Sequence, residues 1–370
     1  MRFIMKGVAG ATLAVAAGTA AAQSSVTLYG VADTFFQWFD SGGTKSWSMR
    51  SGGNSGSMIG LKGSEDLGGG LKAVFTLENG YNINNGTFFA DSSAMFYRQA
   101  WVGLTHEKYG SLSLGRQYQP TFWSLYPTDP FRANEVLSPL AASSTTLDRN
   151  TIATATGGGR SSNAIVYKSP NVGGFQFWSM YALQATVTQP YPQTTGNLLD
   201  IAGTYSGYGL YVGLSYQFQH PGSKSIPGLP AAVNTVAVEH YTAALAYRIG
   251  IVNLQFNYTY HKPDDPAAGS VAARLNAAHP FSVGEIGATI QATPEDAIEI
   301  AGFQRLVRGV HDNTWGIQVG ADHALSKRTS VYARAGYMKN NGAATTTWPG
   351  YTTTAGENQT LVGVGLSHRF

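Results

Sequence analysis

Apolar and polar residues alternate with a period of two over much of this chain. The segment 252–261 (VNLQFNYTYH) has an apolar or aromatic residue at every second position, and 210–219 (LYVGLSYQFQ) and 315–322 (WGIQVGAD) repeat the pattern. Such alternation predicts β-strands with one apolar and one polar face. Each segment is close to the ~9–11 residues that a tilted strand needs to cross a bilayer. The pattern therefore predicts strands that separate an apolar medium from water.

The same pattern predicts sixteen strands between Ser25 and Phe370. Their expected ranges are 25–39, 55–63, 70–80, 94–105, 110–117, 160–168, 173–183, 198–206, 209–219, 236–248, 250–261, 281–292, 295–306, 313–325, 328–339 and 357–370. Short turns and long loops alternate between these strands. The long loops, rich in Gly, Pro, Asn and Thr, are expected near 40–54, 81–93, 118–159, 184–197, 220–235, 262–280, 307–312 and 340–356.

This alternation of short turns and long loops is typical of outer-membrane barrels. An open sheet edge in hydrocarbon would leave backbone amides and carbonyls unpaired, at a cost of several kcal/mol each. We therefore expect the last strand, 357–370, to pair with the first, 25–39. The predicted fold class is all-β, a closed transmembrane antiparallel β-barrel.

Aromatic residues near the predicted strand ends suit the two interfacial girdles of a membrane barrel. The alternative is that they are core aromatics of a soluble β-sandwich. The candidates are Trp38, Trp101, Tyr167, Tyr181, Tyr247 and Tyr337.

Composition and charge support the same fold class. The chain has 45 Gly, 20 Tyr, 17 Phe and 7 Trp, and only 12% of its residues are charged, where soluble domains average about 25%. Cysteine is absent, so no disulfide or thiolate metal site is expected. The net charge of +3 falls to +1 if Arg2 and Lys6 are removed, which gives no basis for nucleic-acid binding.

The first 22 residues predict a cleavable signal peptide. Arg2 and Lys6 precede an Ala-rich apolar run, and Ala20, Ala21 and Ala22 supply the small residues of a cleavage site. The mature chain, 23–370, is expected to be exported as one domain. No later stretch reaches the ~20 apolar residues of a membrane-spanning helix.

The longest predicted connection is the loop 118–159. It contains Pro120, Pro127, Pro130 and Pro139, and it ends on a run of glycines. A loop of this length without regular structure is usually functional or disordered. We expect it to fold inward and to set the bore of a pore.

Several segments resemble the general porins of Gram-negative bacteria, of the beta-proteobacterial type. The resemblance extends over the whole mature chain, and the motifs occur in order. They are 25–33 (SVTLYGVAD), 60–73 (GLKGSEDLGGGLKA), 98–104 (RQAWVGL), 115–118 (GRQY), 169–175 (SPNVGGF), 324–329 (ALSKRT) and the terminal 368–370 (HRF).

The resemblance implies a sixteen-stranded barrel, a homotrimer and a third outer loop folded into the lumen. It also implies that Phe370 is part of the signal read by the barrel assembly machinery. The implied surroundings are outer-membrane lipid and lipopolysaccharide. The implied function is a water-filled channel for passive diffusion of small hydrophilic solutes and ions.

Such a pore selects solutes by its bore and by fixed charges. We expect a basic rung on the wall formed by Arg98, Arg116 and Arg160, with Arg50 and Lys168 as weaker members. The facing acids in the loop are Asp129, Glu135 and Asp148. Arg98 and Arg160 match positions where the resembled family has arginines, whereas Met58 stands where Ser-Arg is common, which weakens the expected anion preference. The alternative for each arginine is a solvated charge at the rim.

Strict alternation presents a difficulty for two of these arginines. Arg116 falls in step with Leu112 and Leu114, and Arg98 with Val102 and Leu104, so both would face lipid. An arginine near the bilayer midplane costs about 2–4 kcal/mol. We therefore expect either a β-bulge, which re-aims a side chain, or a position above the apolar band.

Enzymatic motifs are not found. The eight histidines show no HxxxH spacing, no Gly-x-Ser-x-Gly elbow occurs, and the Gly-rich 51–56 lacks the ending of a phosphate loop. The adjacent acids Asp264-Asp265 and Glu295-Asp296 are compatible with a metal site, but paired acids are mostly exposed, which favours solvated turns. We predict neither enzyme nor cofactor. The remaining alternatives are a substrate-specific channel, a barrel-embedded hydrolase and a soluble β-rich adhesin.

Overall fold

The computed structural model describes residues 25–146, 148–154, 159–184, 195–224 and 233–370. The predicted signal peptide, 1–22, lies outside the described residues. Three short helices and one 3₁₀ turn accompany the strands, and no helix of the described part is long and apolar enough to cross a membrane. They are α1 (Pro120–Leu125), η1 (Tyr126–Thr128), α2 (Pro139–Thr145) and α3 (Val271–Leu275).

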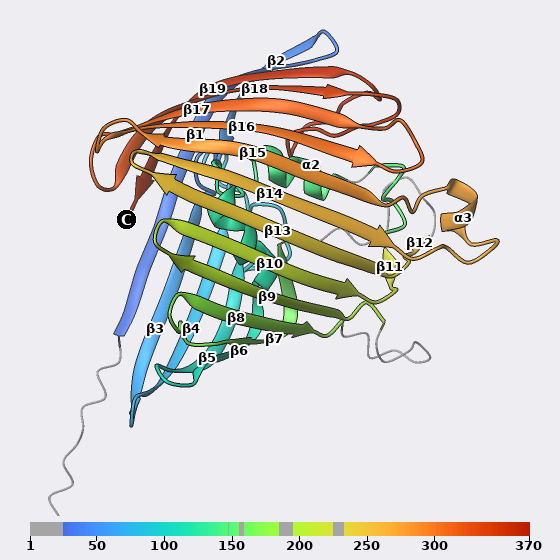
Figure 1. The fold of residues 1–370 in the computed structure, drawn as a ribbon. Helices are drawn as coiled ribbons and strands as arrows, with labels where there is room; N and C mark the ends of the chain where they lie inside the picture. Colours follow the sequence, from blue (N-terminus) through green and yellow to red (C-terminus); the bar gives the residue numbers. More distant parts are fainter. Residues whose placement is uncertain (1–24, 147, 155–158, 185–194, 225–232) are drawn as a thin grey trace, which may run out of the picture.

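Seventeen strand segments form one antiparallel sheet that closes on itself (Figure 1). They are β1 (Ser25–Ser41), β2 (Thr44–Ser51), β3 (Met58–Gly68), β4 (Leu71–Gly80), β5 (Gln99–His106), β6 (Gly110–Tyr118), β7 (Arg160–Lys168), β8 (Phe175–Ala182), β9 (Leu198–Gly207), β10 (Leu210–Gln219), β13 (Val238–Ile249), β14 (Val252–Pro263), β15 (Phe281–Gln291), β16 (Asp296–Val307), β17 (Thr314–Ala324), β18 (Thr329–Asn340) and β19 (Asn358–Arg369). A separate two-stranded ribbon joins β11 (Ser223–Lys224) to β12 (Val233–Asn234).

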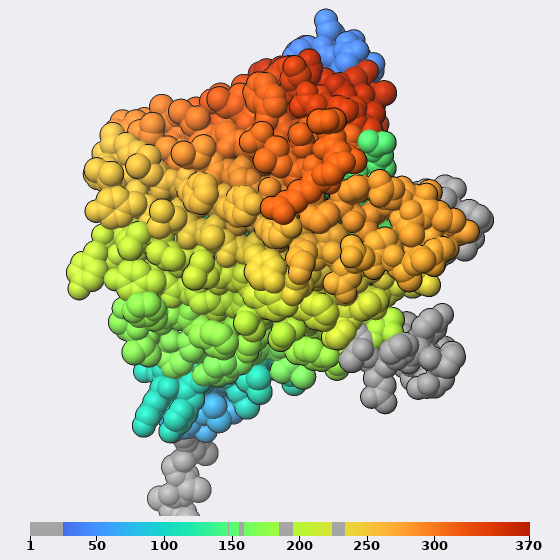
Figure 2. Space-filling view, turned by 45° about the vertical axis from the view of Figure 1, so that its right-hand side comes forward, coloured from blue at the N-terminus to red at the C-terminus, as the bar shows by residue number. Residues whose placement is uncertain are grey.

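The barrel has sixteen strand positions because β2 and β3 share one. β1 pairs with β2 along its second half and with β3 along its first half, while its other edge pairs with β19. The predicted closure of the last strand on the first is therefore confirmed. In Figure 2 the colours of the wall run downward from red and orange through yellow to green, the reverse of sequence order, so segments that are neighbours in sequence lie side by side.

The predicted long loop at 40–54 is wrong. Ser41 pairs with Thr44, and Gly42 and Gly43 form the turn with φ angles of 57° and 88°. Two consecutive residues with positive φ make a tight hairpin turn whose twist matches the strands. The first connection is consequently a hairpin that extends above the wall, and the break in pairing lies later, at 52–57 (Figure 1).

The alternation of faces is confirmed along the wall, and β14 is a clear example. Leu254 and Phe256 are 48% and 43% exposed, whereas Gln255 and Asn257 are 5% and 0% exposed. An apolar outer surface over a polar interior is the reverse of a soluble domain and is the arrangement of a barrel in lipid. This distribution argues against the soluble sandwich.

The largest apolar cluster lies between the inner wall and the segment that joins β6 to β7. Phe35 and Phe39 from β1 pack with Val136 and Leu137 from that segment, and Trp348 closes the cluster. Burial of such side chains contributes about 1.5–3 kcal/mol each. The connecting segment is therefore packed against β1 and against the loop between β18 and β19.

Candidate functional site

The connection from β6 to β7 contains short helices, so the expectation of a segment without regular structure is wrong. Pro120 and Pro139 stand at the start of α1 and α2, where the absent N–H of proline costs nothing. The Ser138 hydroxyl accepts a hydrogen bond from the Ala141 amide at 3.1 Å and caps α2. The prolines that suggested irregular backbone therefore begin two helical turns.

Inner-face amides from strands distant in the sequence hold this segment. Gln255 Nε2 donates to the Pro127 carbonyl at 3.0 Å, and Gln318 Nε2 donates to the Leu137 carbonyl at 2.7 Å. Both glutamines are 5% exposed or less. The segment is thus fixed to strands β14 and β17, far from the two strands that it connects.

Two of the predicted arginines meet one predicted acid. Arg98 Nη1 lies 2.9 Å from Glu135 Oε2, and Arg160 forms an ion pair with the other carboxylate oxygen. Both guanidinium groups also donate to the Tyr118 hydroxyl, Arg98 at 2.8 Å. Burial raises the pKa of Glu135, but the two guanidinium charges outweigh burial, and the pKa is lowered from its ordinary value. Glu135 is therefore an ionised carboxylate between two cations.

A further wall carboxylate adjoins this cluster. Glu78 Oε2 lies 4.0 Å from Arg98 Nε. Glu78 also accepts hydrogen bonds from Tyr29 at 2.7 Å and from Gln99 at 2.7 Å. The cluster thus holds two arginines and two carboxylates, of which only Glu135 comes from the segment between β6 and β7.

Arg116 does not join the ion pair. It donates to the Tyr97 carbonyl and, at 2.9 Å, to the Ser162 hydroxyl. The β6–β7 pairing is irregular between Gly115 and Gln117, at the position where a bulge was expected for Arg116. Arg98 precedes the first residue of β5, so it stands outside the alternating part of that strand. Arg116 therefore belongs to the wall beside the cluster and not to the rung itself.

Asp129 and Asp148 do not face the rung, which corrects the expectation for both. Asp129 accepts hydrogen bonds from the amides of Phe131 and Ala133 at 2.7 and 2.8 Å, and from the Ser138 hydroxyl. Its carboxylate thus closes a turn of its own segment. Burial raises the pKa of Asp129, and these hydrogen bonds oppose the rise.

Asp148 pairs with an arginine that the sequence reading did not select. Its Oδ2 lies 2.8 Å from Arg305 Nη1, and both side chains are fully buried. Arg334 on β18 was also missed, and it pairs with Asp322 at 2.7 Å and Glu299 at 3.6 Å. The alternation could have identified Glu299 and Arg305. Both are out of step with the exposed isoleucines of β16, which places them on the inner face.

Among the described residues, neither of the two weaker cation candidates forms a hydrogen bond or an ion pair with the Glu135 cluster. Arg50 donates to the Pro349 carbonyl at 2.6 Å and lies 4.9 Å from the Tyr351 ring centre, so the last long loop holds it. Lys168 lies 4.3 Å from the Trp178 ring centre.

Trp101 was expected in an interfacial girdle, and this expectation is wrong. Its indole donates to Gln99 at 3.0 Å, and the side chain lines an interior cavity.

Phe370 closes the barrel at its seam. Its backbone exchanges two hydrogen bonds of 3.1 Å with Gly30, and its ring occupies the space that a Cβ at Gly30 would need.

Across the described ranges, no group of three or more His, Asp or Glu side chains is arranged to hold a metal ion.

Comparisons with known proteins agree with this geometry. The family model described as Gram-negative porin matches residues 9–343. The chain is similar to Outer membrane porin protein 32 of Delftia acidovorans, with 30% identity over 96% of this chain and 97% of the relative. It is also similar to an outer membrane porin protein of Bordetella pertussis, with 29% identity over 98% of each. The solved anion-selective porin from Comamonas acidovorans superposes with a TM-score of 0.78 and 28% identity, over 94% of this chain and 100% of that chain.

Proposed function

This chain belongs to the Gram-negative porin family, and we propose that it forms a water-filled channel for passive diffusion of small hydrophilic solutes and ions. Porins of Gram-negative bacteria are outer-membrane proteins, and the apolar outer wall of this barrel suits that lipid environment. The general channel is preferred over a substrate-specific one because the described inner wall mixes neutral amides, such as Gln255 and Gln318, with ion pairs, such as that of Arg334 with Asp322.

We further propose that the segment between β6 and β7 lies in the lumen and sets the bore. The observation that supports this proposal is the ion pair from Glu135 to both Arg98 and Arg160. It joins the segment to the wall on one side, and the hydrogen bonds from Gln255 and Gln318 join it to the wall elsewhere. A segment held at several points inside a barrel narrows the channel and leaves water on either side of it.

The charges at this narrowing support a weak anion preference. Arg98 and Arg160 approach the single carboxylate of Glu135 directly, while Glu78 stands farther away and accepts two hydrogen bonds from the wall. Met58 supplies no further cation, so the preference is expected to be modest.

The homotrimer and the assembly role of Phe370 are proposed on the same family membership. The position of Phe370 at the seam of the barrel supports that role, because a strand that closes the barrel must be recognised before closure. Lipopolysaccharide is the proposed neighbour of the outer wall. Relatives of this chain are channels, and we propose no enzymatic activity.

The proposed function is tested by recording from purified protein in planar bilayers with a KCl gradient. We expect stepwise conductance and a small reversal potential of the sign that favours chloride. Bilayers that stay silent at micromolar protein would contradict a channel. A strongly cation-selective reversal potential would leave the channel intact and contradict the charge assignment.

A further inference from the structure

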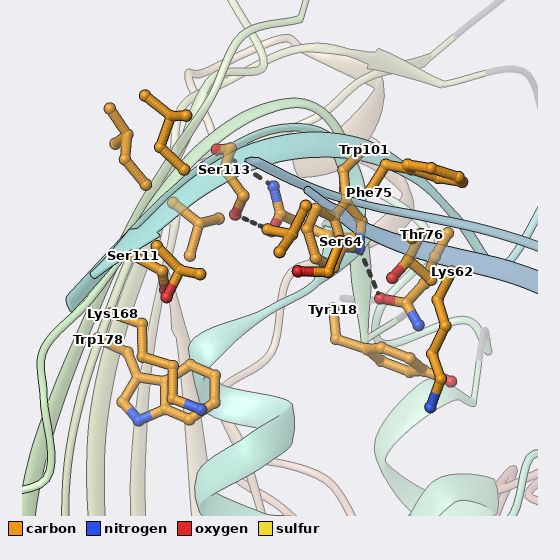
Figure 3. A pocket seen from close by; sticks show the side chains of 18 of the residues that line it. Lys62, Ser64, Phe75, Thr76, Trp101, Ser111, Ser113, Tyr118, Lys168 and Trp178 are labelled. Atoms are coloured by element: carbon orange, nitrogen blue, oxygen red, sulfur yellow. Dashed lines mark hydrogen bonds between the residues drawn. The ribbon is translucent and has the colours of Figure 1, made fainter. Parts of the chain in front are cut away.

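A cavity of about 500 Å³ has Tyr118 but neither Arg160 nor Glu135 in its lining, and a second cavity is lined by all three residues. Residues of β1 and β3–β8 line it, together with Trp123 of α1 (Figure 3). Ser64, Thr105 and Lys168 place it at the end of the barrel that carries the short turns. The cavity is therefore separate from the charge cluster at the narrowing.

The cations of this cavity differ from those of the narrowing. Lys62 and Lys168 both line it, and none of the described residues that line it is acidic. The nearby Glu78 accepts hydrogen bonds from Gln99 and Tyr29. Within the described ranges, neither ammonium group has a hydrogen bond or an ion pair, and each lies over an aromatic ring, Tyr29 at 5.2 Å and Trp178 at 4.3 Å. Arg98 and Arg160 are by contrast bound to Glu135. The two lysines are thus available to an anionic group that enters the cavity.

The same cavity presents indole rings. Trp123 and Trp178 have ring centres 6.0 Å apart at an interplanar angle of 33°, and Trp101 enters from β5. The Trp178 indole nitrogen is buried and has no hydrogen-bond partner among the described residues. Aromatic surface with a few fixed polar groups is the usual composition of a small-molecule site.

Figure 3 shows Lys168 beside Trp178 on one side of the cavity and Lys62 on the other, near Tyr118. A negative group bound at Lys168 would lie directly beside indole surface, because the ammonium is 4.3 Å from the Trp178 ring centre. A ligand that satisfies both features has an anion and a flat ring joined by a short link. Offset stacking of such a ring on an indole is favourable, and the carboxylate–ammonium contact adds to it.

We propose that this inner cavity is a transient binding site for aromatic carboxylates during their passage through the channel. The inference rests on the proposed function, since the solute must reach the cavity through the lumen. Lys168 holds the carboxylate, Lys62 adds a second positive charge, and Trp123 with Trp178 contacts the ring. The site gives a general channel a preference for one class of small anions.

The test uses single channels of the intact protein in KCl, with benzoate added to one chamber. We expect brief current interruptions whose frequency rises with benzoate concentration. Three matched probes are cyclohexanecarboxylate, which has no flat ring, benzyl alcohol, which has no charge, and acetate, which has no ring. Each should interrupt the current about two- to fivefold less often, the effect of losing one such contact.

Two variants test the residues. Lys168→Gln and Trp123→Leu should each weaken benzoate binding about two- to fivefold, while Lys45→Gln, at an exposed position of β2, should bind as the parent does. Lys168→Gln keeps a polar side chain of similar length, so it tests the charge even if Trp123→Leu disturbs α1.

Each outcome assigns the failure to one claim. KCl steps without benzoate interruptions would overturn the inference and leave the channel standing. Absence of KCl steps would overturn the proposed function itself. If cyclohexanecarboxylate interrupts the current as often as benzoate does, the aromatic contact is refuted. If benzoate binds to Lys168→Gln as it binds to the parent, the charge contact is refuted.

Discussion

Replacing Glu135 with glutamine should make the channel more anion-selective. The substitution removes the negative charge that Arg98 and Arg160 share and keeps a side chain of the same shape. The two guanidinium groups then face the passing ions without a direct carboxylate partner from the segment between β6 and β7. Anions should be enriched at the narrowing, and cations should be depleted.

The size of the effect follows from Coulomb's law. A unit charge about 5 Å from a passing ion contributes about 0.8 kcal/mol in water. Screening with a Debye length of about 10 Å at 0.1 M salt reduces this to about 0.5 kcal/mol. That energy corresponds to about twofold enrichment of chloride and about twofold depletion of potassium, so the permeability ratio should change by about four- to fivefold.

The assay is the reversal potential of Glu135→Gln channels under a KCl gradient. Glu107→Gln, in an exposed short turn, is the matched control and should not differ from the parent. Arg98→Ala and Arg160→Ala should shift the reversal potential in the opposite direction, toward potassium. The shift in Glu135→Gln should shrink at high salt. A shift toward potassium in Glu135→Gln, with normal conductance steps, would refute the charge reasoning.

Three further predictions concern stability, assembly and pH. Asp148→Asn leaves Arg305 buried without its ion-pair partner and should cost about 3–5 kcal/mol, measured by urea unfolding in micelles; unfolding at the parent's urea concentration would contradict the pairing. Deletion of Phe370 should lower the amount of folded barrel recovered from outer membranes, while the yield of protein refolded in detergent stays the same; equal recovery from membranes would remove its assembly role. Burial raises the pKa of Asp312, but hydrogen bonds from Arg149 and neighbouring groups outweigh it and lower the pKa to about 2. Because this folded pKa lies below the ordinary 3.8, the contribution of Asp312 is present above about pH 4 and is lost as the pH falls toward 2, so thermal melts of Asp312→Asn and the parent should differ at pH 5 and converge near pH 2.

Alternation predicted the wall well because a period of two assigns each side chain to one of two faces. It placed Gln255 and Asn257 inside and Leu254 and Phe256 outside, as the structure has them. It could not give the height of a residue on the wall, since height depends on the stagger between neighbouring strands. Trp101 is out of step with the exposed Val102 and Leu104 and faces inward, so its assignment to a girdle went against the alternation.

The sequence predicted only a part of the candidate site. Arg98, Arg160 and Glu135 were selected and lie together. Asp148 was matched to the wrong cations, because its partner Arg305 lies on β16 and long-range pairing leaves no local pattern. The helices α1 and α2 were missed because helices of six and seven residues are stabilised by tertiary packing more than by their own sequence.

Liposome swelling with neutral sugars of increasing size tests the general channel most directly. Purified protein should admit small sugars fastest, with rates that fall smoothly as the solute grows and that do not saturate with concentration. Uptake of a single sugar class with saturable kinetics, or no swelling with any sugar, would contradict a general diffusion channel.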